Sequence, residues 1–135
     1  MKLSSMEKHH YIDNIHEFLK SQQIHDMNNY IQHGKTTTYT HCFMVSYYSY
    51  LVSLRLPMKF DTRSIARGAF LHDFYLYDWH IPDQSHKLHG FVHPKFALMN
   101  ARKYFLLNSI EIDIIQSHMW PLTITKYPRC REALL

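Results

Sequence analysis

The segment from Thr37 to Leu54 constrains the fold most, because apolar side chains occupy nearly every side of the helix that it would form. A helix that is apolar on most of its circumference is typically buried at the centre of a domain. Pro57 follows closely, and proline cannot continue a helix. The segment therefore predicts a long central helix covered by other helices. Its apolar residues are Phe43, Met44, Val45, Tyr47, Tyr48, Tyr50, Leu51, Val52 and Leu54.

Signals on the N-terminal side and directly after this segment predict further helices. Residues 5–31 place apolar side chains at intervals of three and four, which predicts an amphipathic helix or a broken pair of helices. Gly34 is expected to end that region, because glycine readily adopts the left-handed conformation found after a helix C-terminus. Asp61 is a favourable N-cap for a helix over 62–74.

The second half of the chain carries its own start and stop signals. Pro82, Gly90 and the polar residues around them predict an ordered loop, and Pro94 suits the first turn of a helix. Asn108, followed three residues later by Glu111, resembles a capping box. The predicted elements are a loop over 75–92, helices over 94–107 and 109–119, and a short helical end over 129–135.

These elements add up to an all-α protein. The 135 residues include only three glycines and five prolines, and we recognise no strand pair, repeat or linker in the sequence. A chain of this length buries one core rather than two. We therefore expect a single helical bundle of five or six helices that forms one domain over residues 1–135.

Charge and cysteine content narrow the function classes. The net charge of +4 is spread along the chain without a dense basic stretch, which argues against a nucleic-acid-binding protein. No apolar stretch approaches the roughly 20 residues that span a bilayer. Cys42 and Cys130 form neither a metal-binding pair nor a disulfide framework, as is usual in reducing compartments. The expectation is a soluble cytoplasmic protein without membrane contact.

Histidine is the residue whose frequency stands out, with twelve in 135 positions. His72 and Asp73 directly follow the apolar run IARGAFL, and a helix that buries this run draws the pair toward the interior. A buried carboxylate needs a partner to offset its desolvation, and a divalent metal is one such partner. The pair is therefore a candidate for metal ligation, although a His-Asp dipeptide by itself is a weak signal.

Three further histidines fall on other predicted helices or helix ends. Each has a simpler explanation on its own: His41 as a hydrogen-bonded core residue, His93 as a loop residue, and His118 as a cation favoured at a helix C-terminus. Together with His72 and Asp73 they form the order H…HD…H…H. A bundle could therefore bring all five side chains to one centre.

At these residues the sequence resembles the HD-domain superfamily of metal-dependent phosphohydrolases, over about residues 36–122. It is especially similar to small stand-alone bacterial HD proteins with an HDxxLYDWH…HGxxHP…HMWPLT run. The segments that carry the resemblance are THCFMVSYYSYLVS, ARGAFLHDFYLYDWH, LHGFVHPKFALMNA and IIQSHMWPLT. The resemblance implies an HD-type helical bundle that hydrolyses a small phosphomonoester or phosphodiester, with a nucleotide as the expected substrate.

The resemblance also assigns roles to the five residues. It makes His41, His72 and Asp73 the ligands of one divalent transition metal, and Asp73 the bridge to a second metal held by His93 and His118. His72 and Asp73 are then the catalytic pair, since two bridged metals can activate water and neutralise phosphate charge. Fe, Mn, Ni, Co and Zn all suit such a ligand set.

Residues around the predicted loop are candidates for substrate binding. Lys87 and Lys95 flank it and could hold the substrate phosphate, although most lysines of this kind are merely solvated. His89 lies beside them and is the rival of His93 as a metal ligand, but the His-Pro sequence at the helix start favours His93. Trp120 also flanks a site element, and core packing is the commoner role of such a residue.

The chain departs from the family pattern at one position. HD proteins usually supply a final aspartate ligand from a later helix, and no Asp follows His118 here. Three explanations are open: a shortened member of the family, a ligand from Asp113, Asp83 or another subunit, or an incomplete site. The alternative function is accordingly a degenerate HD domain that binds a nucleotide or partner without turnover. In a shortened member, exposed Leu134 and Leu135 could drive formation of a homodimer.

Overall fold

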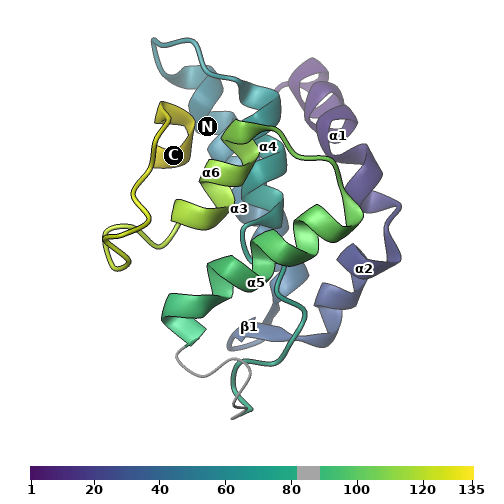
Figure 1. Ribbon diagram of the computed structural model, residues 1–135. Coiled ribbons are helices and arrows are strands. Elements are labelled where there is room, and N and C mark those ends of the chain that lie inside the picture. The colour runs from purple at the N-terminus through teal and green to yellow at the C-terminus, as the bar shows by residue number, and fades with distance from the viewer. Residues whose placement is uncertain (82–88) are drawn as a thin grey trace.

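The computed structural model describes residues 1–81 and 89–135, with only the backbone at His89, and is an all-α bundle (Figure 1). Two short 3-10 helices and a pair of short strands complete the described elements. The α-helices are α1 (Ser5–Leu19), α2 (Gln22–His25), α3 (Thr38–Arg55), α4 (Thr62–Leu71), α5 (His89–Tyr104) and α6 (Ser109–Ser117). The remaining elements are η1 (Asp26–Asn29), β1 (Ile31–His33), β2 (Thr36–Thr37) and η3 (Arg131–Leu134).

The helix buried on all sides is α4, and not α3 as the sequence predicted. Every residue of α4 from Ser64 to Leu71 is buried, and the helix packs against α3, α6, α1 and α5 (Figure 1). On α3, in contrast, the side chains of Met44 and Tyr48 are 48% and 54% exposed. Gly68 allows α6 to approach α4 closely, since a Cβ atom at this position would lie only 2.8 Å from Cδ1 of Ile114 on α6.

A buried ion pair helps to fix α4 against its neighbours. The Arg67 guanidinium donates to Glu111 on α6 at 2.9 Å and also pairs with Glu17 on α1. A buried arginine requires such partners, because an unpaired charge in the interior is strongly destabilising. Arg67 therefore couples the helix that precedes the His-Asp pair to the helix that precedes His118.

The predicted N-caps of α4 and α6 are confirmed, whereas α4, α5 and α6 each end two or three residues earlier than expected. The Asp61 side chain accepts a hydrogen bond from the backbone N–H of Ser64, and Asn108 and Glu111 form the predicted capping box. Helix α4 ends at Leu71 and α6 ends at Ser117, so His72 and His118 are both C-cap residues.

The prediction that the chain contains no strand pair is wrong. Strands β1 and β2 form a short antiparallel hairpin, and Gly34, at φ 54°, makes its turn instead of ending a helix. The preceding residues 5–31 contain α1, α2 and η1, which confirms the broken-helix alternative. Ser21 accepts a hydrogen bond from the N–H of Ile24 and so starts α2 immediately after α1 ends.

The start of α5 also differs from the expectation. The helix begins at His89, within the segment predicted as a loop, so His93 and Pro94 lie inside the helix and not at its start. Proline inside a helix lacks the N–H that would bond to the carbonyl oxygen four residues earlier, here that of Gly90. No helix of the described residues is sufficiently long and apolar to span a bilayer.

Candidate metal centre

The four histidines among the predicted ligands converge on the carboxylate of the fifth, Asp73. Its Oδ2 atom lies 3.3 Å from Nε2 of His41 and 3.2 Å from Nε2 of His72. Its Oδ1 atom lies 3.2 Å from Nε2 of His93 and 3.3 Å from Nε2 of His118. We refer to His41, His72 and Asp73 as the Oδ2 group, and to Asp73, His93 and His118 as the Oδ1 group; each could hold a metal ion.

Four helices bring these side chains together. His41 lies in the first turns of α3, His72 caps the C-terminus of α4 with Asp73 directly after it, His93 lies in α5, and His118 caps α6. His72, Asp73 and His93 are buried, and His41 and His118 are half-buried. The site therefore depends on the packing of the whole bundle and not on one local segment.

Hydrogen bonds to backbone carbonyls orient two of the imidazole rings. Nδ1 of His72 donates to the carbonyl oxygen of Ala69 at 2.6 Å, and Nδ1 of His118 donates to that of Ile115 at 2.8 Å. The proton on Nδ1 leaves Nε2 with a free lone pair in the neutral ring, which is the form that binds metals. The C-cap position creates this contact, because the last carbonyls of a helix lack the regular partner four residues later in the chain.

The distance between the donor nitrogens of the Oδ2 group fits metal coordination. Two nitrogens that each bind a metal at about 2.1 Å are about 3.0–3.4 Å apart in octahedral or tetrahedral geometry. Nε2 of His41 and His72 lie 3.3 Å apart, whereas Nε2 of His93 and His118 lie 2.8 Å apart and would have to separate slightly to bind one ion. Oδ1 of Asp73 is buried and accepts no hydrogen bond within the described residues, and a metal ion would satisfy it.

The electrostatics favour an ionised carboxylate. Burial alone would raise the pKa of Asp73, but the charge of His72 and contacts with His118 and His41 hold this pKa well below its usual range. Burial lowers the pKa of His118, which favours its neutral form. Burial also acts to lower the pKa of His72, but the negative charge of Asp73 and the hydrogen bonds to Asp73 and Ala69 together raise it. Protons therefore compete with a metal more strongly at His72 than at His118.

A hydrogen-bond network that contacts Asp73 was not predicted from the sequence. Gln32, at the centre of β1, is buried, and its Nε2 donates to Oδ2 of Asp73 at 3.1 Å. The hydroxyl groups of Tyr75 and Thr38 both donate to Oε1 of Gln32, so the amide nitrogen must face Asp73. No local pattern indicates such a role for Gln32, because it arises from a hairpin of a few residues that packs against α3.

The other predicted site residues lie elsewhere or outside the described part of the chain. Lys87 and Asp83 lie outside the described residues, as does the side chain of His89. Lys95 is exposed on α5. The carboxylate of Asp113 accepts the backbone N–H groups of Arg129 and Cys130 at 2.8 and 2.9 Å. Asp113 therefore anchors the C-terminal segment and does not supply the expected further ligand.

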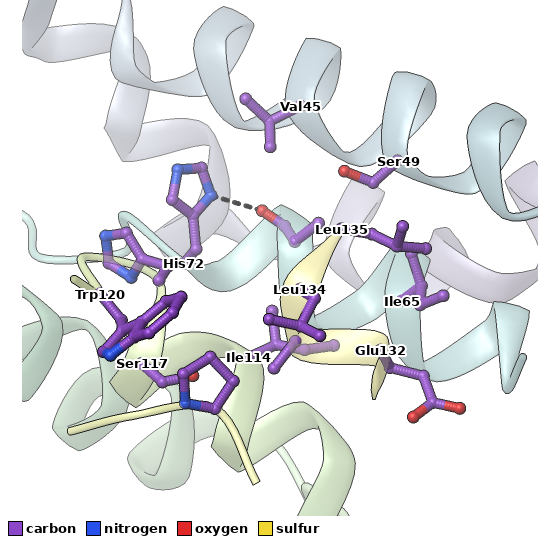
Figure 2. Close-up of a pocket in the computed structure, with 14 residues that line it drawn as sticks. Val45, Ser49, Ile65, His72, Ile114, Ser117, Trp120, Glu132, Leu134 and Leu135 are labelled. Carbon is purple, nitrogen blue, oxygen red and sulfur yellow. Dashed lines mark hydrogen bonds between the residues drawn. The ribbon is translucent and has the colours of Figure 1, made fainter. Parts of the chain in front are cut away.

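A cavity of about 370 Å³ adjoins the centre, and His72 and His118 form part of its wall (Figure 2). Residues of α3, α4, α6 and the C-terminal segment line the rest, including Trp120. A second, more open cavity of about 500 Å³ lies beside His41 and shares the walls Val45 and Ser49. The centre is therefore accessible from two sides of α3.

Comparison of the chain with models of protein families, with curated proteins and with solved structures gave no match.

Proposed function

We propose that this protein is a metal-dependent phosphohydrolase of the HD-domain type, which cleaves a small phosphomonoester or phosphodiester. The observation that carries the proposal is the shared carboxylate: Asp73 faces two histidines with each of its oxygens, at 3.2–3.3 Å. Two such three-residue groups would hold one or two divalent transition metals, such as Fe, Mn, Ni, Co or Zn.

The number of ligands supports catalysis over a purely structural metal site. Each group supplies three protein ligands, and catalytic metal sites commonly keep a position open for water or substrate, whereas structural zinc sites are closed by four protein ligands. When bound, the metals would supply an activated water for attack on phosphorus and positive charge to offset that of the phosphate. The chain needs no Ser or Cys nucleophile for this chemistry.

The residues of the centre have distinct tasks in this proposal. Asp73 holds both groups together, and its burial excludes bulk water from the carboxylate. The carbonyl oxygens of Ala69 and Ile115 keep His72 and His118 in the metal-binding tautomer. The same two histidines face the 370 Å³ cavity, so a phosphate ester that enters it would present its phosphate at the centre.

The test combines metal content with turnover. We expect about one or two transition metals per purified chain, with hydrolysis of 4-nitrophenyl phosphate or bis(4-nitrophenyl) phosphate, as for two-metal hydrolases. Asp73→Ala should lose the metal and the activity, because it removes a ligand from both groups. Asp13→Ala is the matched control, since Asp13 is an exposed carboxylate on α1 that contacts His9 at 3.6 Å.

Two other outcomes would contradict the proposal in different ways. A wild-type protein that binds no metal after incubation with Mn, Fe, Ni or Zn salts would rule out a metal centre. Metal that is bound and lost in Asp73→Ala, without hydrolysis of either ester, would favour the alternative of a degenerate domain that binds a ligand without turnover.

A further inference from the structure

We propose that the 370 Å³ cavity binds the uncharged, apolar organic group of a phosphomonoester that carries a single phosphate. This inference rests on the proposed function and specifies its substrate class. The cavity touches one histidine of each group, His72 and His118, whose rings lie 4.9 Å apart. A ligand in the cavity therefore has one end beside these two histidines and the other end between α3, α4 and α6.

The walls away from the histidines are mostly apolar. Figure 2 shows Val45 and Ser49 projecting from α3 toward the C-terminal segment, with Ile65 and Ile114 on neighbouring helices. Trp120 lines the same cavity and offers an aromatic face. Pockets of about 300–1,000 Å³ with apolar walls and few polar groups are typical sites for small organic ligands. The complete lining is Val45, Ser49, Ile65, Ala69, His72, Ile114, Ser117, His118, Trp120, Pro128, Glu132, Ala133, Leu134 and Leu135.

The polar groups of the lining are largely committed to the protein itself. Ser117 donates its hydroxyl hydrogen bond to the carbonyl oxygen of Asp113. The carboxylate of Glu132 accepts the N–H of Asp61 at 3.1 Å and points away from Val45 and Ser49 in Figure 2. The hydroxyl of Ser49 makes no hydrogen bond with the described residues, so it can orient a polar atom of the ligand.

The absence of cationic side chains limits the charge of the ligand. No Lys or Arg occurs among the described residues that line this cavity or the 500 Å³ cavity next to His41. A second or third phosphate in either cavity would lie in a largely apolar environment without a positive partner, which is costly. The metal centre can neutralise one phosphate. The walls thus favour monophosphates over diphosphates and triphosphates.

Binding of two phosphate esters to the metal-free protein tests the cavity independently of catalysis. We expect calorimetry to give a dissociation constant for 1-naphthyl phosphate at least about tenfold lower than for glycerol 3-phosphate, since the naphthyl ring buries far more apolar area. Val45→Lys and Ser49→Leu should both reduce this preference, by adding a charge to the cavity and by filling it. Val52→Lys is the control, because Val52 is also half-buried on α3 but lines neither cavity.

Turnover by the metal-loaded protein tests the charge limit. We expect AMP to be hydrolysed with a kcat/KM at least about tenfold above that of ATP, and Val45→Lys to narrow this ratio, because the added ammonium partners the extra phosphates. Circular dichroism and thermal melts show whether each variant folds. Ser49→Leu provides a second variant that fills the cavity without adding a charge.

Each result separates this inference from the proposed function. Equal binding of the naphthyl and glycerol esters, or an unchanged preference in both cavity variants, would overturn the cavity assignment even if hydrolysis is efficient. A naphthyl preference that persists in a protein without metal or activity would support the cavity and refute the proposed reaction. Preference for ATP over AMP would overturn the single-phosphate limit.

Discussion

The Oδ2 group and the Oδ1 group share one carboxylate but differ in what holds its two oxygens. Oδ2 of Asp73 accepts a hydrogen bond from Gln32, whose amide is fixed by Tyr75 and Thr38. Oδ1 is buried and accepts no hydrogen bond within the described residues. A buried acceptor without a partner costs about 1–3 kcal/mol. The protein therefore orders the Oδ2 group through an additional residue, Gln32, whereas Oδ1 faces only the imidazole nitrogens of His93 and His118, and a metal ion would bind all three atoms.

This difference has a consequence for metal binding. In the Oδ2 group, Gln32 fixes the carboxylate of Asp73 before a metal binds. Less side-chain conformational entropy is therefore lost when the metal binds. In the Oδ1 group, metal binding relieves an unsatisfied oxygen and should stabilise the fold more strongly. The two groups are thus expected to respond differently to variants that leave Asp73 in place.

The largest effect should come from removing one histidine of each group. We expect His118→Ala to lose the metal of the Oδ1 group and His41→Ala to lose that of the Oδ2 group, because each leaves only two protein ligands where about three are typical of a catalytic site. Elemental analysis and anomalous diffraction would measure the occupancy of each position. His9→Ala is the control, since His9 is exposed on α1 and contacts only Asp13 among the ion pairs described.

Loss of all metal in both variants would show that the groups form one cooperative centre. Full retention in either variant would show that the missing histidine is not a ligand.

A smaller effect should come from Gln32→Ala. We expect the metal affinity of the Oδ2 group to fall about 10–100-fold, as is usual when a residue that orients a ligand is removed. The affinity of the Oδ1 group should change much less. Chelator competition in the His118→Ala and His41→Ala backgrounds would report on each group separately.

Gln116→Ala provides the control for loss of an amide, because Gln116 is on α6 and lines a different cavity beside Asp113. Equal losses of affinity in the two groups would mean that Gln32 supports the carboxylate as a whole and not one oxygen. Tyr75→Phe should reproduce the direction of the Gln32→Ala effect at lower magnitude, since it releases only one of the two hydroxyl groups that orient the amide.

The sequence predicted the histidines of the centre but not Gln32, which donates a hydrogen bond to Asp73. The five candidate ligands were recognised because their residue types and order are specific, and the caps at Asp61 and Asn108 because capping is a local interaction. Gln32 belongs to a hairpin whose strands are too short to show an alternating pattern. Its burial results from packing against α3, which no window of sequence contains.

The sequence predicted α3 as the central helix, whereas the structure has α4 in that place, and the reason is similar. Helix α4 contains Arg67 and Ser64, which normally indicate a solvent-exposed face, and both are buried because partners on other elements satisfy them. Helix α3 is apolar on most sides, yet part of that surface lines the two cavities and stays accessible. The apolar composition of α3 therefore predicted a fully buried helix, whereas part of its surface forms the walls of the two cavities.

The smallest effect, and the one that best tests how packing positions the Oδ1 group, should come from Gly68→Ala. The added Cβ would meet Cδ1 of Ile114 at 2.8 Å and its Cβ at 3.0 Å, and the second atom cannot move by side-chain rotation. Helices α4 and α6 would have to separate slightly. The strain of about 1–3 kcal/mol exceeds the roughly 1 kcal/mol that alanine contributes over glycine within a helix.

This separation should act mainly on one group, because His72 and Asp73 directly follow α4 while His118 directly follows α6. We expect the free energy of unfolding to fall by about 1 kcal/mol and metal affinity to fall severalfold in the Oδ1 group alone, since the Oδ2 group spans α3 and α4. Gly90→Ala is the control, because a Cβ there meets no atom within 4 Å. A comparable loss in the Oδ2 group would show that α3 and α4 move together with α6, and that the two halves of the centre are not positioned independently.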